Sequence, residues 1–154
     1  MRALRSVRED ELVTSGPGTR ARTRYALRAP DRLAFTTDRG VRTVQIGRRQ
    51  WLRAPGEQWT VAPIPGGIPF RTRTWFRWSP YARTVELLGE RRGVAELAAA
   101  DPATPVWFRL SVDERTGRVL REELVARARL IRHRFFGFNG GVTIVPPKDA
   151  IRAG

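Results

Sequence analysis

The sequence contains no cysteine, which excludes disulfide bonds, zinc–thiolate centres and thiol catalysis. His133 is the only histidine and Met1 the only methionine, so one chain cannot assemble a soft-metal site. The motifs of nucleophile-elbow hydrolases, phosphate-binding loops and dinucleotide folds are also absent. Glu122 and Glu123 are adjacent, and on a strand they would point to opposite faces rather than form a catalytic pair. We therefore expect no metal, no cofactor and no enzymatic activity.

Acidic residues are scarce. The chain has 15 of them against 29 basic residues, a formal net charge of +14, and only Lys148 among the basic residues is a lysine. Such an excess attracts anionic partners, whether phospholipid headgroups, nucleic acid or acidic proteins. No apolar run approaches the roughly 20 residues of a membrane helix. Residues 1–13 also lack the apolar core of a secretory signal.

With 154 residues, 41% of them hydrophobic, the chain has the size of one domain. A domain of this size buries roughly 70% of its unfolded surface and needs no cross-link. The chain begins on an alternating pattern at residues 4–9, without a helical lead-in. We therefore expect a single domain, 1–154, that lacks an N-terminal helix or is cut from a longer protein.

A period of two is the main structural signal. In residues 19–28, Thr, Ala, Thr, Tyr and Leu alternate with Arg, Arg, Arg, Ala and Arg. This pattern predicts a strand with one face on a core and the other in water. The same alternation recurs in residues 70–78 and 106–113. The sequence therefore predicts an antiparallel sheet that is apolar inside and rich in arginine outside.

Turn residues separate these strands at short intervals. Asp38-Arg39-Gly40 predicts a hairpin turn, and residues 113–117 predict a type I turn with Gly117 in the bulge position. Three prolines and two glycines in residues 63–69 predict a loop. Residues 142–145 follow a further turn into an extended segment, and Pro146-Pro147 are expected to end the fold.

Two segments allow more than one interpretation. Residues 94–100 have helical propensity and fit a short helix. Residues 118–135 fit a helix or a strand. As one strand they put Leu124 on one side and His133 on the other. Because the segment follows a hairpin turn, we favour the strand.

Particular residues resemble a known family. They are residues 25–32, Gln45-Ile46-Gly47, Trp51-Leu52-Arg53 with Trp59, residues 105–108, Asp113 with Thr116-Gly117, Phe138-Asn139 and Val145-Pro146-Pro147. In this order they resemble the LolA- and LppX-like lipoprotein carriers, most closely actinobacterial extracytoplasmic domains, some of them attached to CopD-like copper-transport membrane proteins. The resemblance implies a curved, unclosed antiparallel half-barrel, mainly β (α+β), with a short helix or loop plug on its concave face. It also implies an extracytoplasmic location and an apolar cavity for acyl chains.

Aromatic residues are the candidates for lining that cavity. They are Trp75, Phe76, Trp78, Tyr25, Phe35 and Trp107. Four arginines of one strand face are the candidates for pairing anionic headgroups or lying on an anionic membrane. They are Arg20, Arg22, Arg24 and Arg28.

The sequence thus predicts non-catalytic binding of a lipid-like or other hydrophobic ligand at the cell envelope. Two alternatives remain open at this stage. One is a ligand-free interaction domain tethered to a membrane transport protein. The other is a basic, non-specific nucleic-acid binder, which the lack of stacking aromatics on the arginine face disfavours.

Overall fold

The computed structural model describes residues 4–16, 18–65, 82–101, 103 and 105–153. These residues form one sheet of twelve strands in the order β12-β6-β5-β4-β3-β2-β1-β11-β10-β9-β8-β7. The strands are β1 Ser6–Ser15, β2 Thr19–Arg28, β3 Arg32–Thr37, β4 Arg42–Ile46, β5 Arg49–Arg53, β6 Thr60–Pro63, β7 Thr84–Arg91, β8 Val94–Asp101, β9 Val106–Asp113, β10 Arg118–Ala126, β11 Arg129–Phe136 and β12 Ile151–Arg152.

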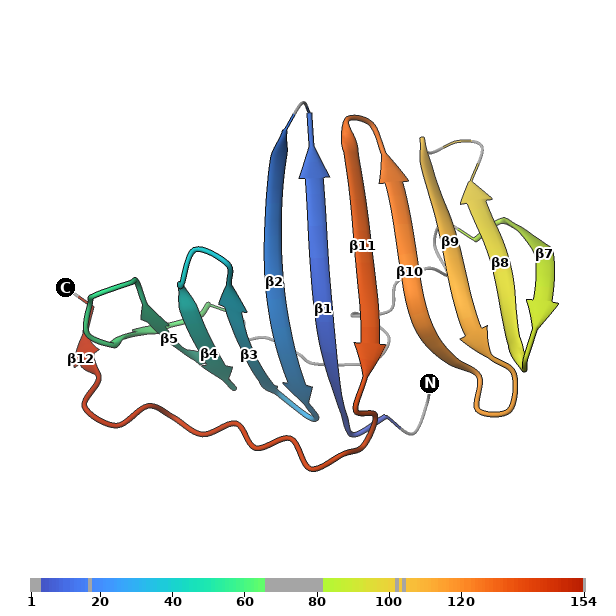
Figure 1. Cartoon of the computed structure of the whole chain (residues 1–154). Coiled ribbons are helices and arrows are strands. Elements are labelled where there is room, and N and C mark those ends of the chain that lie inside the picture. The colour runs from blue at the N-terminus through green and yellow to red at the C-terminus, as the bar shows by residue number, and fades with distance from the viewer. Residues whose placement is uncertain (1–3, 17, 66–81, 102, 104, 154) are drawn as a thin grey trace.

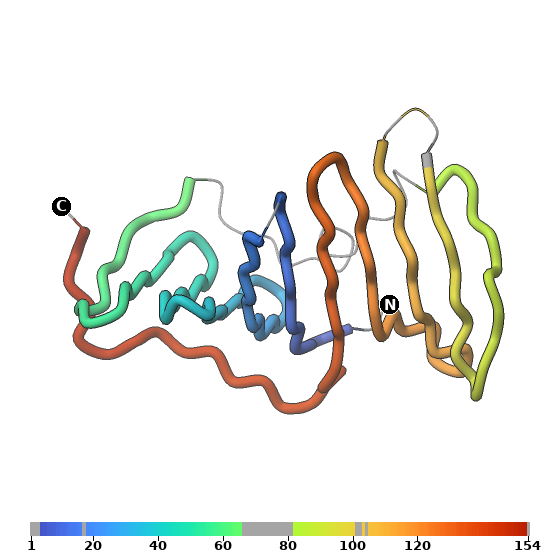
Figure 2. Tube along the Cα trace, turned by 45° about the horizontal axis from the view of Figure 1, so that its top comes forward, coloured from blue at the N-terminus to red at the C-terminus, as the bar shows by residue number. Residues whose placement is uncertain are grey.

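The sheet is open and curved (Figures 1 and 2), which confirms the expected mainly β half-barrel. All neighbouring strands are antiparallel except β12 and β6, which pair in parallel. The described residues contain no helix, and hence none that is long and apolar enough to cross a membrane. The predicted strand 70–78 and most of the predicted loop 63–69 lie outside the described residues.

The period-two pattern of β2 is confirmed. Thr23 and Leu27 are buried, whereas the arginines that alternate with them are exposed. We call the face that carries Leu27 the inner face and the face that carries the arginines the outer face. Phe108 and Leu110 of β9 are buried on the inner face by the same alternation.

The core lies on the inner face of the central strands. Its buried members are Leu4, Val7, Leu27, Leu33, Ala99, Phe108, Leu110, Val119 and Phe135. Strand pairing aligns several of them across the sheet, as for Val7 opposite Leu27 and Leu27 opposite Leu33. Burial of such side chains stabilises the fold by about 1.5–3 kcal/mol each.

Both predicted hairpin turns are confirmed. Gly40 adopts a φ of 80° and Gly117 a φ of 63°. The carboxylate of Asp113 accepts hydrogen bonds from the backbone and the hydroxyl of Thr116, at 2.8 Å and 2.5 Å. These two bonds hold the pKa of Asp113 below its usual value.

The structure corrects both ambiguous segments. Residues 94–100 belong to strand β8, so the short helix is wrong: pairing with β7 and β9 outweighs the high helical propensity of alanine. Residues 118–135 are neither one helix nor one strand. The chain reverses at Arg127 and Ala128, where Ala128 takes a φ of 61°, and forms the hairpin β10–β11.

The end of the chain also differs from the sequence-based expectation. Residues 142–145 are not a strand but part of an extended segment, residues 137–150, which we call the C-terminal strap. The strap runs along one end of β1 to β5 in Figure 1. Pro146-Pro147 do not end the fold, because Ile151 then pairs with Thr60 of β6.

Candidate functional site

A row of polar side chains crosses the centre of the inner face. Pairing aligns Thr23 of β2, Glu11 of β1, His133 of β11 and Glu122 of β10. Glu9, two residues from Glu11, is only 1% exposed. Carboxylates are rarely buried without partners, so we expect Glu9 to be held by its neighbours. We call Glu9, Glu11, Thr23, Glu122 and His133 the buried polar cluster.

Glu9 and His133 form the centre of the cluster. His133 Nδ1 lies 2.5 Å from Glu9 Oε1, and both side chains are largely buried. Burial acts to lower the pKa of His133, but the hydrogen bond to Glu9 and the charges of Glu9, Glu122 and Glu11 outweigh it and leave that pKa above its usual value. The imidazolium form is therefore stabilised relative to that of a free histidine.

This cluster was not predicted from the sequence. If residues 118–135 formed one strand, His133 and Leu124 would lie on different faces of the sheet. The two-residue turn at Arg127–Ala128 reverses the alternation, so that Glu122 of β10 and His133 of β11 share the inner face. The single histidine was a signal, but its partner Glu9 is 124 positions away and is found only through the β1–β11 pairing.

Three members of the cluster could ligate a cation. One ligand atom each of Glu9, Glu11 and His133 lies within 4.8 Å of the others. The set consists of two carboxylates and one imidazole, which suits a hard or borderline divalent ion and not a soft one. In the structure each of these groups has a side-chain partner: His133 contacts Glu9, and Glu11 Oε1 accepts a hydrogen bond from Tyr25 Oη at 3.1 Å.

Two of the predicted cavity aromatics come together beside the cluster. The rings of Tyr25 and Phe35 are 5.5 Å apart on β2 and β3, and both pack against the core. Burial and the neighbouring Glu11 raise the pKa of Tyr25. Trp107 lies on the opposite face, because it alternates with the buried Phe108, and it is 36% exposed.

Trp75, Phe76 and Trp78 lie outside the described residues. Of the six predicted cavity residues, the structure therefore brings two together on the inner face and turns one outward.

Two buried polar atoms next to this aromatic pair lack a partner. Thr43 lies opposite Phe35, and Gln45 lies opposite Leu33. Among the described residues, nothing hydrogen-bonds to Thr43 Oγ1 or Gln45 Oε1, although Gln45 Nε2 donates to Gln50 Oε1 at 2.7 Å. An unsatisfied buried group costs about 1–3 kcal/mol, so a polar group that reached either atom would gain a hydrogen bond that the protein itself does not supply.

Replacing the hydroxyl of Thr43 provides a direct test of this cost. We expect Thr43→Val to raise the free energy of unfolding of the ligand-free protein by about 1 kcal/mol, because the substitution removes a buried unsatisfied group at nearly constant volume. Urea denaturation of both proteins measures the difference. Thr36→Val on the exposed face of β3 is the control, for which a change within about 0.5 kcal/mol is expected. A destabilised Thr43→Val protein contradicts the assignment.

The predicted arginine face is present on β2. Arg20, Arg22, Arg24 and Arg28 are all exposed on the outer face. Arg28 donates to the carbonyl of Val142 in the strap at 3.2 Å, so its role is partly structural. The arginines thus point away from the face that carries Tyr25 and Phe35.

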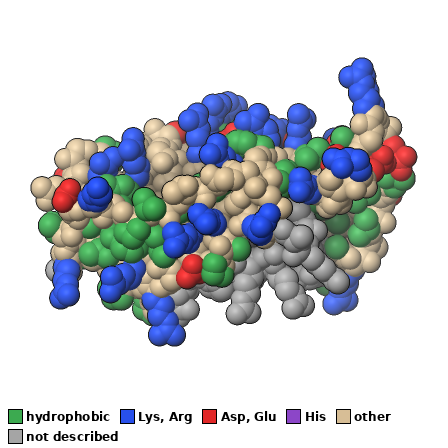
Figure 3. All heavy atoms as spheres, turned by 90° about the horizontal axis from the view of Figure 1, so that it is seen from below, with side chains coloured by type: hydrophobic (Ala, Val, Ile, Leu, Met, Phe, Trp, Pro, Cys, Tyr) green, Lys and Arg blue, Asp and Glu red, His purple; other side chains and the backbone are tan. Residues whose placement is uncertain are grey.

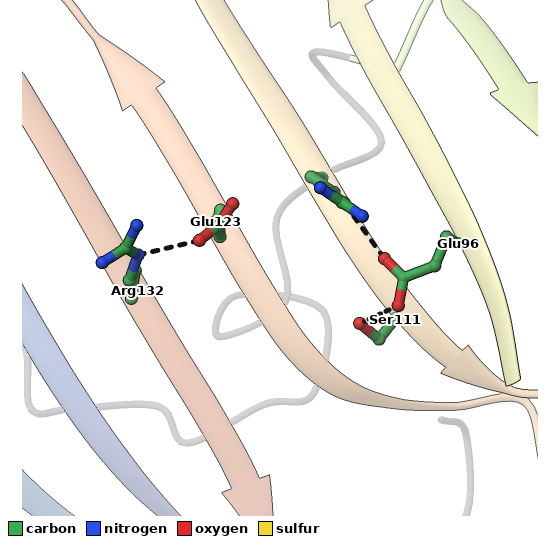
Figure 4. A network of polar contacts seen from close by, with 5 residues as sticks. Glu96, Ser111, Glu123 and Arg132 are labelled. Atoms are coloured by element: carbon green, nitrogen blue, oxygen red, sulfur yellow. Dashed lines mark hydrogen bonds and ion pairs between the residues drawn. The ribbon is translucent and has the colours of Figure 1, made fainter. Parts of the chain in front are cut away.

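Further polar contacts cover the outer face of the neighbouring strands (Figure 4). Arg132 of β11 pairs with Glu123 of β10 at 2.8 Å. Glu96 of β8 accepts from Ser111 at 2.6 Å and pairs with Arg109 at 3.1 Å. These contacts link β8 to β9 and β10 to β11. Because Glu96 and Glu123 are paired with Arg109 and Arg132, they do not pair with the arginines of β2.

No protein-family model matches the chain, and no curated protein matches it. Solved structures do. LppX, a lipoprotein of Mycobacterium tuberculosis, superposes with a TM-score of 0.60 at 12% identity, over 93% of this chain and 91% of that chain. LprF from Mycobacterium bovis gives a TM-score of 0.58 at 10% identity, over 95% and 90%.

The chain has a LolA/LppX-like lipoprotein-carrier fold. Pseudomonas aeruginosa MucB, in its complex with MucA, also matches, with a TM-score of 0.50 at 19% identity, over 99% of this chain and 56% of that chain. At these identities the likeness concerns the fold alone. It agrees with the resemblance inferred from the sequence, and it extends over nearly the whole of LppX and LprF.

Proposed function

We propose that this protein binds an uncharged amphiphile on the inner face of its sheet, without catalysis, on the outer side of the cell envelope. The observation that carries the proposal is the apolar surface around Tyr25 and Phe35, which adjoins the unpartnered polar atoms of Thr43 and Gln45. Apolar surface with a few convergent polar groups is the usual composition of a ligand site. The lipoprotein-carrier fold supports an acyl chain as the apolar part and an extracytoplasmic location.

The buried polar cluster argues for an uncharged head group. Glu9, Glu11 and Glu122 share the inner face with a single histidine. The charge near the site is therefore negative. This differs from the expectation that arginines at the site pair with anionic headgroups. Like charges at partly desolvated positions repel by several kcal/mol at contact distances, so an anionic head group is disfavoured. Thr43 and Gln45 instead suit a hydroxyl, ester or amide.

Binding of chain-matched probes tests this proposal. We expect a long-chain alcohol to bind about tenfold more tightly than the fatty acid of equal length at pH 8. Each added methylene should strengthen binding about fourfold, since it contributes ~0.8 kcal/mol. Calorimetric titration measures both. Phe35→Ala should weaken binding, whereas Phe136→Ala, on the outer face, is the control that leaves it unchanged.

Native mass spectrometry with organic extraction of the purified protein identifies the natural ligand class. An alcohol that does not bind, or a fatty acid that binds equally well, contradicts the proposal. An apo mass that persists after incubation with the alcohols would favour the second candidate, an interaction domain. The observation behind that candidate is the sheet edge β7, where Val85, Leu87 and Leu88 are 58%, 54% and 47% exposed. An apolar edge strand can pair with a strand of another chain.

A further inference from the structure

The outer face carries a hollow that the proposed function does not use. It has a volume of about 410 Å³ and spans four adjacent strands, β2, β1, β11 and β10, where two rows of outward side chains flank Glu11, Thr23, Glu122 and His133. Its outward side chains are Arg22, Arg24, Asp10, Leu12, Arg132, Arg134, Arg121 and Glu123. We call this set the arginine basin. Seen from below in Figure 3, Lys and Arg side chains crowd the upper side of the molecule.

The charges of the basin are unbalanced. Asp10 is paired with Arg134 at 2.6 Å, and Glu123 is paired with Arg132 at 2.8 Å. Both carboxylates are therefore already neutralised. The three other basin arginines are exposed, and their side chains make no ion pair with any described residue. They are Arg22, Arg24 and Arg121.

These three arginines surround the paired groups. Arg24 lies opposite Asp10, Asp10 opposite Arg134, and Arg134 opposite Arg121, so one row across the sheet carries three guanidinium groups and one carboxylate. Arg22 lies in the next row, opposite Leu12. The unpaired charges thus stand on both sides of the hollow, where an anionic group can meet them together.

An apolar row adjoins the basin. Trp107, Val125 and Leu130 are aligned on the outer face by strand pairing, and Trp107 and Val125 are 36% and 42% exposed. Val125 is two residues beyond Glu123 along β10, a step of about 7 Å. We call this row the apolar rim. Exposed tryptophan beside basic residues is typical of surfaces at the membrane–water interface.

We propose that the arginine basin and the apolar rim dock the outer face onto a bilayer that contains anionic phospholipid. The basin binds phosphate-bearing headgroups, and the rim enters the interfacial region beside them. Nucleic acid fits less well, because Trp107 is the single aromatic side chain of the rim, and Val125 and Leu130 offer no ring on which further bases could stack. Phe136, the next residue after Arg134 on the same face of β11, has its ring covered by that guanidinium group at 5.1 Å.

Co-sedimentation of the full chain with vesicles tests the proposal. We expect binding to phosphatidylcholine vesicles that contain phosphatidylglycerol, and little binding to phosphatidylcholine alone. Since each basic group at the surface contributes about fivefold to partitioning, the variant Arg22→Gln/Arg24→Gln/Arg121→Gln should lose on the order of 100-fold. Trp107→Ser should weaken binding by a smaller factor. Circular dichroism confirms that each variant is folded.

The control removes the same charge elsewhere. Arg39→Gln/Arg91→Gln/Arg115→Gln changes three exposed arginines outside the basin, and we expect it to keep binding within about threefold. An equal loss in both triple variants, or unchanged binding in the basin variant, overturns the proposal. Tighter binding to a DNA duplex than to the vesicles at the same salt, abolished by the basin variant, also overturns it. Ligand binding on the inner face does not interfere, because it leaves the protein in the supernatant.

Discussion

Replacing His133 by alanine is expected to lower the free energy of unfolding by about 3–5 kcal/mol at pH 6. The substitution removes the imidazolium that pairs with the buried carboxylate of Glu9, and breaking a buried pair from one side costs this much. The double variant Glu9→Gln/His133→Ala separates charge from packing. If the buried charge of Glu9 causes the loss, the double variant recovers part of it, although the cavity left by the imidazole remains. Urea denaturation of both variants measures the difference.

The same pair makes stability depend on pH. Since the pKa of His133 in the folded protein lies above the unfolded value, its stabilising contribution is complete below the unfolded value of about 6.5. The contribution is then lost as the pH rises through the folded pKa. We expect His133→Ala to abolish this component of the pH profile. A profile that is unchanged in the variant, or a cost below about 1 kcal/mol, contradicts the role assigned to the pair.

The fold could be predicted from the sequence wherever the signal is local. In β2 the alternation of arginine with apolar residues extends over the whole strand, and the structure reproduces it. The turns before Gly40 and Gly117 need a positive φ, so glycine identifies them without knowledge of the rest of the chain. The helix expected at residues 94–100 failed because alanine fits a strand between two neighbours, and only the sheet supplies those neighbours.

The candidate site could be predicted only in part. Tyr25 and Phe35 were found from their strand patterns, and they meet because β2 and β3 are adjacent. The same alternation already indicated that Trp107 does not line an inner cavity, because Trp107 shares its face with Arg109 and not with Phe108. The Glu9–His133 pair needs the turn at residues 127–128 and the pairing of the first strand with the last antiparallel one. Neither is encoded in a short window of sequence.

The two faces of the sheet thus differ in the chemistry they offer. The inner face combines aromatic surface with buried carboxylates, which suits an uncharged amphiphile. The outer face has guanidinium groups that make no ion pair within the described part of the chain, and these suit anionic headgroups. A protein that docks on an anionic bilayer with one face keeps the other face free for a ligand drawn from it. The proposals are tested separately, because one depends on Phe35 and the other on Arg22, Arg24 and Arg121.

The C-terminal strap gives the second large effect. Ile144 is 3% exposed, whereas its neighbour Val145 is 60% exposed. The strap is anchored to the sheet near these residues, since Arg32 of β3 donates to the carbonyl of Ile144 at 2.7 Å. We expect Ile144→Ala to lower the free energy of unfolding by about 2–5 kcal/mol, through lost burial and the cavity it leaves.

Val145→Ala is the matched control, because it shortens an adjacent side chain that is already in water and should change stability by less than about 0.5 kcal/mol. Chemical denaturation of the three proteins in parallel measures both effects. Equal stabilities would mean that the strap does not pack on the sheet. Unequal stabilities in the expected order would establish that the strap packs on the sheet through Ile144 and is part of the folded domain.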